Sequence, residues 1–124
     1  METKFNFNSQ VCTDRFQSER LLALGLKKET ADIEICCLDG EIRFLEDENY
    51  QDTGITIPAW SLHRLVSTLI NSGIIITFID NIVIIERYKD FQKSYEFWDD
   101  LYDNFIDCIE WLIKEGYFNK EYLV

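Results

Sequence analysis

The longest regular pattern of hydrophobic positions in this 124-residue chain lies between Asp90 and Glu115. Large apolar side chains recur there at alternating steps of four and three residues, which is the spacing of one stripe along an α-helix. The stripe consists of Phe91, Tyr95, Trp98, Tyr102, Phe105, Ile109 and Leu112. The sequence therefore predicts one long amphipathic helix that ends at Gly116.

The aromatic character of this stripe indicates what the helix packs against. Phe, Tyr and Trp side chains fit poorly into the narrow seam of a two-stranded coiled coil, whereas they can cover a flat β-sheet. We therefore expect the preceding elements to form a sheet that supports the helix.

Two shorter stretches also have helical patterns. Asp14 followed by Gln17 resembles a capping box, and the apolar positions after it predict a helix over about 14–24. A further helix is expected to open at Pro58, because proline at the first helical position loses no hydrogen bond. It is expected to end at 71–73, and its core stripe is Leu62, Leu65, Val66, Leu69 and Ile70.

The segment 33–46 has the pattern of a β-hairpin. Its Asp39-Gly40 dipeptide tolerates the positive φ values of a tight two-residue turn. Ile42 and Phe44 then alternate with charged neighbours, as expected for a strand with one exposed face.

The segment 74–88 predicts a second hairpin, with a turn at Asp80-Asn81. This dipeptide adopts the left-handed conformation less readily than one with glycine, so a single continuous strand is the alternative. The segment is rich in isoleucine and valine on both sides of the turn. Such strands are covered on both faces, or by the chain on one face and by a partner on the other.

These elements follow the order α-ββα-ββα. The simplest packing is a single α+β domain over 1–124, in which the two hairpins form a mainly antiparallel four-stranded sheet under the long C-terminal helix. Residues 1–12 are expected to form a loose N-terminal arm, or a short edge strand over 4–8 with Phe5 and Phe7 on one side.

The charge of the chain limits its partners. Acidic residues outnumber basic residues by 23 to 12, and the formal net charge is −11. Such a field repels phosphate groups and anionic lipids, so neither nucleic acid nor a membrane is expected as a direct partner. The N-terminus lacks the basic and apolar regions of a secretory signal, and no apolar run reaches the length of a membrane span. A cytoplasmic location is the expectation.

A row of carboxylates is the first candidate for a functional surface. Its members lie about 140° around the predicted long helix from the aromatic stripe, and no basic residue interrupts the row. They are Glu96, Asp100, Asp103, Asp107 and Glu110. The row is either a solvated face or a docking surface for a basic protein, including an inhibitor that mimics nucleic acid.

A second candidate is the opposite flank of the same helix, which is also apolar. It carries Phe97, Leu101, Cys108 and Trp111. Either the helix at 14–24 or the N-terminal arm covers these side chains, or they form a contact with a second copy or another protein.

The third candidate surrounds His63, the only histidine, with Trp60 and Arg64 beside it. Nucleophilic catalysis needs a base within reach of a hydroxyl or thiol, but Ser61 falls on a different helical face from His63. No catalytic residue is therefore predicted. Trp60 is expected to be either a core anchor or a binding hot spot, and His63 a surface or half-buried residue.

Neither a metal nor a cofactor is predicted. The cysteines, at 12, 36, 37 and 108, lack the two-residue gap typical of a metal site, and we expect them to be reduced and mostly buried. The acidic stretch at 46–52 fails as a calcium loop, because Asp52 stands where glycine is needed and Pro58 where a bidentate glutamate is needed. The five glycines are scattered and form no phosphate-binding loop.

Several segments together resemble small uncharacterised acidic proteins of gut Bacteroidetes, often carried by prophages or mobile elements. They are 5–12, 21–26 with 29–32, 57–65, and 107–113 with 116–118. The resemblance covers about half of the chain, leaves out both hairpins, and implies only a cytoplasmic accessory protein of such elements. The expected function is therefore a non-enzymatic accessory protein that acts through protein contacts, with the acidic inhibitor as the alternative.

Overall fold

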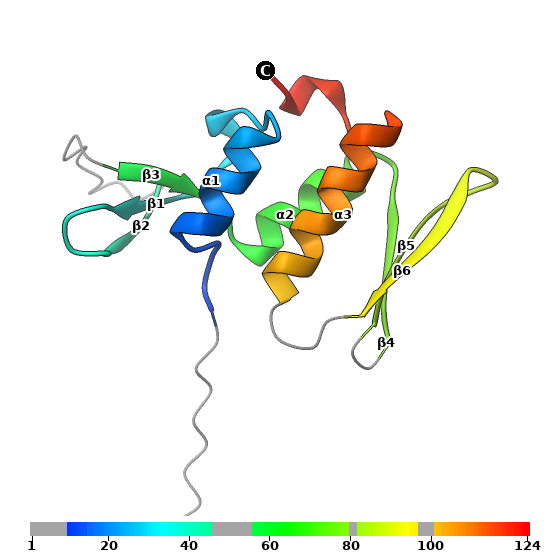
Figure 1. Cartoon of the computed structure of the whole chain (residues 1–124), viewed down its shortest axis with the longest axis horizontal. Coiled ribbons are helices and arrows are strands. Elements are labelled where there is room, and N and C mark those ends of the chain that lie inside the picture. The colour runs from blue at the N-terminus through cyan, green and yellow to red at the C-terminus, as the bar shows by residue number, and fades with distance from the viewer. Residues whose placement is uncertain (1–9, 46–55, 80–81, 97–100) are drawn as a thin grey trace, which may run out of the picture.

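The computed structural model describes residues 10–45, 56–79, 82–96 and 101–124, and it has an α+β architecture. Three helices lie between two three-stranded antiparallel sheets at opposite ends of the molecule (Figure 1). The elements are α1 (Arg15–Ala23), β1 (Ile33–Cys36), β2 (Ile42–Phe44), β3 (Thr56–Ala59), α2 (Leu62–Ile70), β4 (Ile75–Ile79), β5 (Ile82–Arg87), β6 (Phe91–Glu96) and α3 (Leu101–Glu115). Short 3₁₀ turns occupy Lys28–Thr30 and Lys120–Tyr122.

Helix α1 confirms the predicted helix at 14–24 and its capping box. The Asp14 carboxylate accepts a hydrogen bond from the Gln17 backbone N–H at 2.8 Å. The Gln17 side chain in turn accepts from the Asp14 backbone N–H at 3.0 Å. The two residues thus satisfy each other's backbone donors and fix where the helix begins.

The N-terminal sheet has the order β2-β1-β3. Its β1–β2 hairpin confirms the prediction for 33–46, with Gly40 at a φ of 71° in the turn. The Asp39 carboxylate accepts from the Glu41 backbone N–H at 2.9 Å, and this hydrogen bond lowers the pKa of Asp39. The stretch at 46–52 lies outside the described residues.

The C-terminal sheet has the order β4-β5-β6. Strands β4 and β5 confirm the predicted hairpin at 74–88, although its turn residues lie outside the described part of the chain. The expected four-stranded sheet is wrong, because each hairpin instead pairs with a third strand of its own. These third strands are β3 and β6.

Strand β6 also breaks the predicted helix at 90–115. Residues 91–96 are extended, and α3 begins only at Leu101, so a long C-terminal helix is present but shorter than predicted. The inner face of β6 carries Phe91, Lys93 and Tyr95, and the lysine conceals the two-residue period. Its ammonium lies 4.5 Å from the centroid of the Trp111 ring, so a cation–π contact occupies the place of an apolar residue.

The part of the predicted stripe that lies on α3 is helical and buried, as expected. Its four members on α3 are all buried: Tyr102, Phe105, Ile109 and Leu112. Trp98 lies outside the described residues. The stripe packs partly on the sheet and partly on the other helices, and Phe105 lies 6.0 Å from Phe78 of β4 between ring centroids.

The prediction that α2 opens at Pro58 is wrong. Pro58 lies in β3, an edge strand, where a missing backbone N–H costs little. The helix begins after Ser61, whose hydroxyl accepts from the Arg64 backbone N–H. Leu65 and Leu69 are buried as predicted, whereas Ile70 is 59% exposed, which contradicts its assignment to the core. The predicted end at 71–73 is confirmed, with Gly73 at a φ of 79°.

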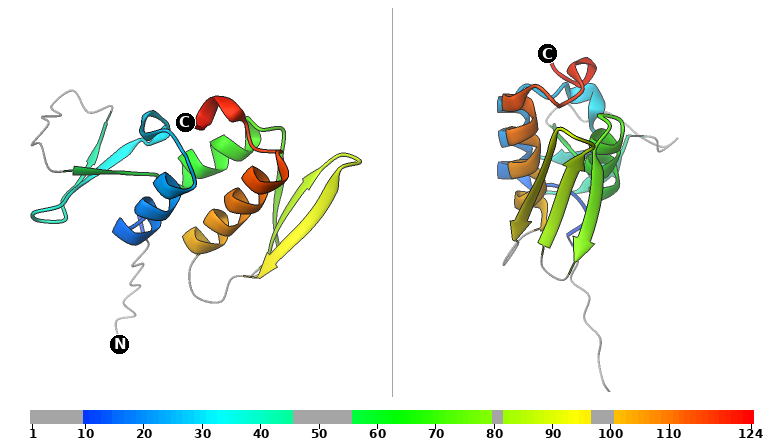
Figure 2. Two further views of the ribbon diagram at one scale, coloured as in Figure 1. Left: turned by 45° about the horizontal axis from the view of Figure 1, so that its top comes forward. Right: turned by 90° about the vertical axis from the view of Figure 1, so that its right-hand side faces the viewer.

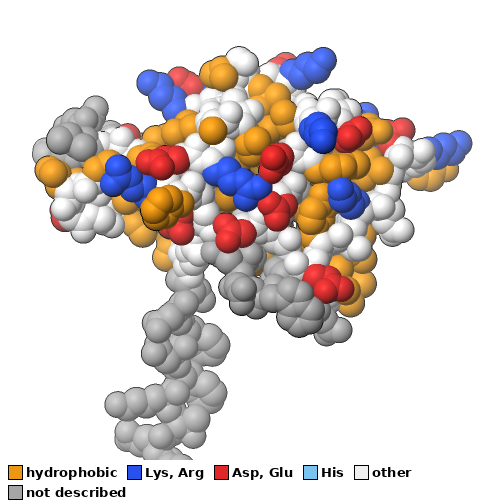
Figure 3. All heavy atoms as spheres, in the orientation of Figure 1, with side chains coloured by type: hydrophobic (Ala, Val, Ile, Leu, Met, Phe, Trp, Pro, Cys, Tyr) orange, Lys and Arg blue, Asp and Glu red, His pale blue; other side chains and the backbone are white. Residues whose placement is uncertain are grey.

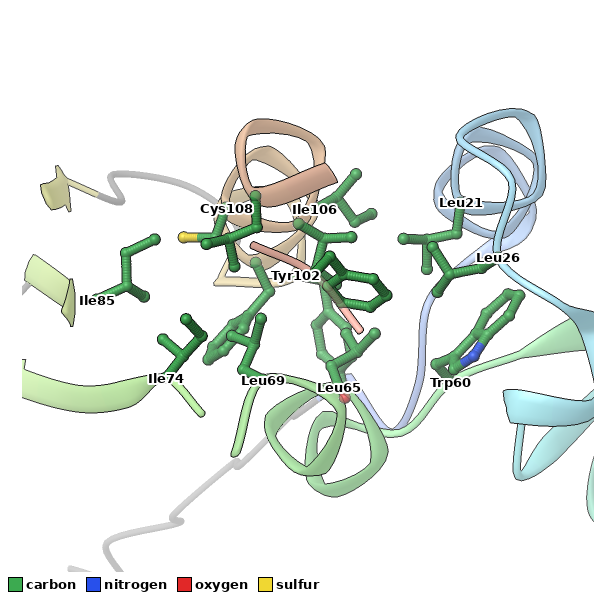
Figure 4. Close-up of a cluster of buried hydrophobic side chains, with 14 of the residues drawn as sticks. Leu21, Leu26, Trp60, Leu65, Leu69, Ile74, Ile85, Tyr102, Ile106 and Cys108 are labelled. Carbon is green, nitrogen blue, oxygen red and sulfur yellow. The ribbon is translucent and has the colours of Figure 1, made fainter. Parts of the chain in front are cut away.

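The main core fills the space between the three helices and the C-terminal sheet. Figure 4 shows Leu65 and Leu69 of α2 pointing toward side chains that come from the other two helices and from the sheet. Cys12, Cys36 and Cys108 are buried and Cys37 is exposed, in agreement with the expectation that these side chains are mostly buried, and none of the four forms a disulfide. Burial raises the pKa of the Cys12 thiol to about 11 and that of the Cys108 thiol to about 12.

Candidate protein-interaction surface

The acidic row does not form an unbroken surface on one helix. Asp103, Asp107 and Glu110 are exposed on α3, but Glu96 lies on β6, and Asp100 lies outside the described residues. The row therefore has only three described members on the helix for which it was predicted.

A cation from α1 also interrupts the row, contrary to expectation. Nη2 of Arg20 donates to Asp107 Oδ1 and to Glu110 Oε2, both at 2.6 Å. Although partial burial lowers the pKa of Arg20, these two hydrogen bonds outweigh it and raise the pKa. Acidic and basic side chains are interspersed over the face that α1 and α3 present in Figure 3. These carboxylates therefore tie α3 to α1.

The apolar flank of α3 is covered within the chain. The Trp111 ring lies 4.9 Å from that of Phe91 on β6 and 6.0 Å from that of Tyr117. Cys108 is buried, and Leu101 packs against the main core. Strand β6 thus covers Trp111, whereas the sequence predicted that the helix at 14–24 or the N-terminal arm would cover it. Phe97 and the arm at 1–9 lie outside the described residues.

Trp60 is a core anchor. Its side chain is fully buried, and its Nε1–H donates to Thr30 Oγ1 at 2.9 Å. Its backbone N–H donates to Thr13 Oγ1, and its carbonyl accepts from the Thr13 N–H, so it joins the start of α1 to the end of β3. Such a residue is not available as a binding hot spot.

His63 is exposed on α2, whereas Arg64 is half-buried. Arg64 lines a hollow of about 280 Å³, together with Lys27, Glu29, Thr30, Ser67, Thr68, Asn71, Glu121 and Tyr122. The charged residues in this lining are two cations and two carboxylates. With no excess of either sign, the hollow gives no reason to select a charged ligand.

A shallower groove of about 420 Å³ runs between the start of α1 and the β1–β2 hairpin. Its apolar lining includes Val11, Cys12, Ile35 and Ile42. Nothing described lies in this groove, and its chemistry identifies no occupant.

The outer face of the C-terminal sheet is an apolar surface that follows directly from strand register. Residues paired across antiparallel strands share a face. Because Val83 and Ile85 of β5 are buried, the alternate positions lie outside. The apolar ones are Ile75 and Ile79 of β4 and Ile82 and Ile84 of β5; we call these four residues the isoleucine face.

The isoleucine face has no cover within the described chain. Figure 2, right, looks onto this sheet with its strands nearest the viewer and the helices behind them. Ile75 is 55% exposed and Ile79 is 51% exposed. Of the two alternatives that the sequence left open for 74–88, the described structure shows the one-sided arrangement, in which only the inner face is covered.

Strand β4 also exposes one large apolar side chain on its other face. Phe78 points to the inner side with Val83, its partner on β5, but is 50% exposed because β4 is an edge strand. The five residues of β4 include neither a charged residue nor a proline. This edge therefore lacks the features that usually prevent a strand from pairing with another chain.

The sequence contained a signal for this surface. An edge strand with one solvated face normally alternates apolar and polar residues, but β4 reads Ile-Ile-Thr-Phe-Ile. The isoleucine-rich run was predicted as a hairpin, whereas the predicted site residues lie elsewhere, at Trp60, His63 and Arg64, in the acidic row and on the apolar flank of α3. The run indicated an uncovered apolar face because its apolar residues point to both faces of the strand.

Comparison of the chain with known proteins finds no matching family model, no matching curated protein and no matching solved structure. Among the described helices, none combines the length and the apolar character that crossing a bilayer requires. Within the same residues, no group of three or more His, Cys, Asp or Glu side chains is placed to hold a metal ion.

Proposed function

We propose that this chain is a non-enzymatic accessory protein that works through contact with another protein, and that the isoleucine face forms the contact. The observation that carries the proposal is the register of β4 and β5. It sets Ile79 directly beside Ile82, on a sheet face that no described element covers. Contiguous apolar surface of this kind is typical of protein-binding sites.

The border of the face indicates the chemistry of the partner. Glu86 and Glu96 lie on the same outer face, opposite Ile75 and Ile82 respectively. A matching surface has an apolar centre and basic residues at its rim. The net charge of −11 also accelerates association with such a partner at low ionic strength.

The proposal that the protein is not an enzyme has support from the candidate nucleophiles. Burial raises the pKa of the Cys12 and Cys108 thiols, so both are protonated at neutral pH and weakly nucleophilic. Ser61 donates its hydroxyl hydrogen to Asp32 and caps α2. These groups serve the fold.

The alternative function, an acidic inhibitor that mimics nucleic acid, has less support. A decoy needs free carboxylates, but Asp107 and Glu110 already bind Arg20. Gln17 also donates to Asp103, at 2.8 Å. The resemblance to small Bacteroidetes proteins is the reason to include a phage or mobile-element origin and a cytoplasmic location in the proposal.

A matched pair of substitutions tests the proposed contact. Ile84→Lys places an ammonium in the middle of the isoleucine face, on the central strand. Phe16→Lys makes the same kind of change at a residue that is 81% exposed on α1. Partners captured by the full-length chain from the source cells are identified, and their affinity for each purified variant is measured by calorimetry.

We expect Ile84→Lys to weaken binding by at least about tenfold, because it inserts an unpaired charge into an apolar contact, and Phe16→Lys to leave the affinity unchanged. Added salt should also weaken binding to the wild-type chain. Equal affinities for Ile84→Lys and the wild type would show that the isoleucine face is not the contact. Circular dichroism establishes that each variant is folded.

A further inference from the structure

The four edge strands of the two sheets differ in how they are protected against pairing with another chain. Strand β2 has three residues and carries Arg43, and β3 contains Pro58. Strand β6 carries Lys93 and Glu96. Short length, charge and proline are the usual devices that keep an edge unpaired. Strand β4 has five residues and none of these devices.

We infer that β4 pairs in antiparallel orientation with β4 of a second copy of this chain, so that the two C-terminal sheets join into one sheet of six strands. The two-fold axis passes beside Thr77. Ile75 then faces Ile79 of the second copy, and Ile76 faces its Phe78. The sequence of β4 suits this register, because apolar residues lie at equal distances on both sides of Thr77.

Exposure on both faces of β4 favours pairing at the edge over face-to-face packing. Ile75 and Ile79 are about half exposed on the outer face, and Phe78 is half exposed on the inner face. Two outer faces packed together would leave Phe78 in water. Edge pairing brings apolar neighbours to both faces and also satisfies the free backbone groups of the strand.

Charge favours a second copy over a highly charged foreign strand at this edge. The strand has no side chain that could pair with a charge, whereas its own sequence offers an uncharged apolar surface of the same length. The two copies still repel through their net charge of −11 each. Added salt screens this repulsion, so it should strengthen the dimer.

The inference goes beyond the proposed function because it concerns the edge of β4 and needs no foreign partner. Ile82 and Ile84 of β5 remain uncovered in the dimer, which presents two isoleucine faces on one sheet. Substitution of Thr77 therefore tests the dimer, and substitution of Ile84 tests the contact with a partner. Either proposal can fail while the other holds.

Sedimentation equilibrium of the full-length chain over a wide concentration range is the first test. The monomer has a mass of 14.8 kDa, and we expect the wild-type chain to approach twice this value as concentration rises. Thr77→Lys places two ammonium groups beside each other at the axis. Ser94→Lys adds the same charge to the same outer face, but on β6, and is the matched control.

We expect Thr77→Lys to weaken dimerisation by at least about tenfold and Ser94→Lys to preserve it. A wild-type chain that stays monomeric at every concentration overturns the inference. So does a dimer that both variants weaken equally, or neither variant weakens. Thermal unfolding of each variant excludes loss of the fold as the cause.

A disulfide tests the register. Directly opposed residues of an antiparallel pair lie at Cα separations of about 4.5–5.5 Å, which fits a disulfide. In a Cys37→Ser background, which removes the exposed thiol, Thr77→Cys should give a covalent dimer on mild oxidation, and Ser94→Cys should not. Absence of this dimer, or equal yields from the two positions, contradicts the symmetric pairing.

Discussion

The two sheets share a strand number and an antiparallel arrangement, but they bury different amounts of apolar surface. The N-terminal sheet contributes to a small cluster of Cys12, Ile33 and Ala59, with Ile35 packed against it. The inner face of the C-terminal sheet contributes Val83 and Ile85 to the main core that the helices share. The number of strands in a sheet therefore does not determine how much apolar packing anchors the sheet to the rest of the molecule.

The residue patterns of the two sheets explain a second difference. Strand β1 begins Ile-Glu-Ile, and its Glu34 lies opposite Arg43, so one face carries charged residues. Strands β4 and β5 place isoleucines on both faces. A strand that is apolar on both sides needs cover on both sides, and the residues that the structure describes cover only the inner side. The C-terminal sheet is thus the better anchored of the two and also the more suited to binding.

Two isoleucine-to-alanine changes test whether the sheets differ in anchoring. Ile85 and Ile33 are both fully buried, one in the main core and the other in the small cluster. We expect Ile85→Ala to lower the free energy of unfolding by about 4 kcal/mol and Ile33→Ala by about 2 kcal/mol, because the smaller cluster can relax around the cavity. Urea denaturation measures both.

The expected order matters more than either value. If Ile33→Ala cost as much as Ile85→Ala, the small cluster would be packed as rigidly as the main core. The comparison between the two sheets would then reduce to their outer faces and edges. An unchanged dependence on urea concentration in both variants establishes that the denatured states remain comparable.

The buried thiols give each end of the molecule a pH probe. Well below pH 9 the Cys12 and Cys108 thiols are protonated in both the folded and unfolded states, and their contribution to the free energy of unfolding is fully present. Above pH 9 the unfolded chain loses these protons first, because burial raises the folded pKa of Cys12 to about 11 and of Cys108 to about 12. At pH 10 ionisation of each thiol in the unfolded chain should therefore lower the free energy of unfolding by about 1 kcal/mol.

Cys12→Ala and Cys108→Ala should each flatten the fall in stability between pH 8 and 10 by this amount, although both variants begin less stable because of the cavity. Urea midpoints at several pH values measure the slopes. The exposed Cys37→Ala is the control and should follow the wild type. A wild-type slope in either buried variant would show that its thiol is accessible to solvent in the folded state.

The contact between α1 and α3 tests the link between the two ends. Arg20 binds Asp107 and Glu110, but these side chains are 39–51% exposed, so solvent screens the pairing. We expect Arg20→Gln to lower the free energy of unfolding by about 0.5–1 kcal/mol, and less in high salt. Arg15→Gln breaks the more exposed pair with Glu19 within α1 and should cost about 0.3 kcal/mol. Equal costs would mean that Arg20 does not contribute to the link.

The local elements that the sequence predicted correctly have strong signals in adjacent residues. The capping box of Asp14 and Gln17 and the turn at Gly40 involve neighbours along the chain and do not depend on tertiary packing. The fold class was therefore predictable, together with α1, both hairpins and the last fifteen residues of the helix predicted at 90–115, which form α3.

The errors arose where a residue gains its role from a distant contact. Lys93 interrupts the apolar alternation of β6, and its close contact with the ring of Trp111 on α3 shows why a lysine can lie on that face. Arg20 neutralises carboxylates that lie 87 and 90 residues away. Pro58 fits the first position of a helix as well as an edge strand, and pairing with β1 decided between them. Sequence spacing alone contains none of these contacts.

The turns of the two sheets provide the last test. One of them has a lysine where a glycine would be expected, so the sequence contains no sign of its left-handed conformation. The β1–β2 turn has Gly40 at a φ of 71°, whereas the β5–β6 turn has Lys89 at a φ of 64°. A side chain in this left-handed region costs about 1–2 kcal/mol, and glycine avoids that cost but is more flexible in the unfolded chain. Lys89→Gly should therefore stabilise the protein by about 0.5 kcal/mol, while Gly40→Ala should destabilise it by about 1 kcal/mol.

Thermal unfolding at one protein concentration measures both changes. No heavy atom outside the immediate chain neighbours lies within 4 Å of a Cβ built at Gly40, so the cost there comes from the backbone conformation and not from crowding. A destabilising Lys89→Gly would show that Lys89 contributes more through its side chain, whose ammonium lies 5.5 Å from the centroid of the Tyr88 ring, than it costs through its backbone. The strain in the β5–β6 turn would then be offset locally, and the absence of glycine there would have a physical reason.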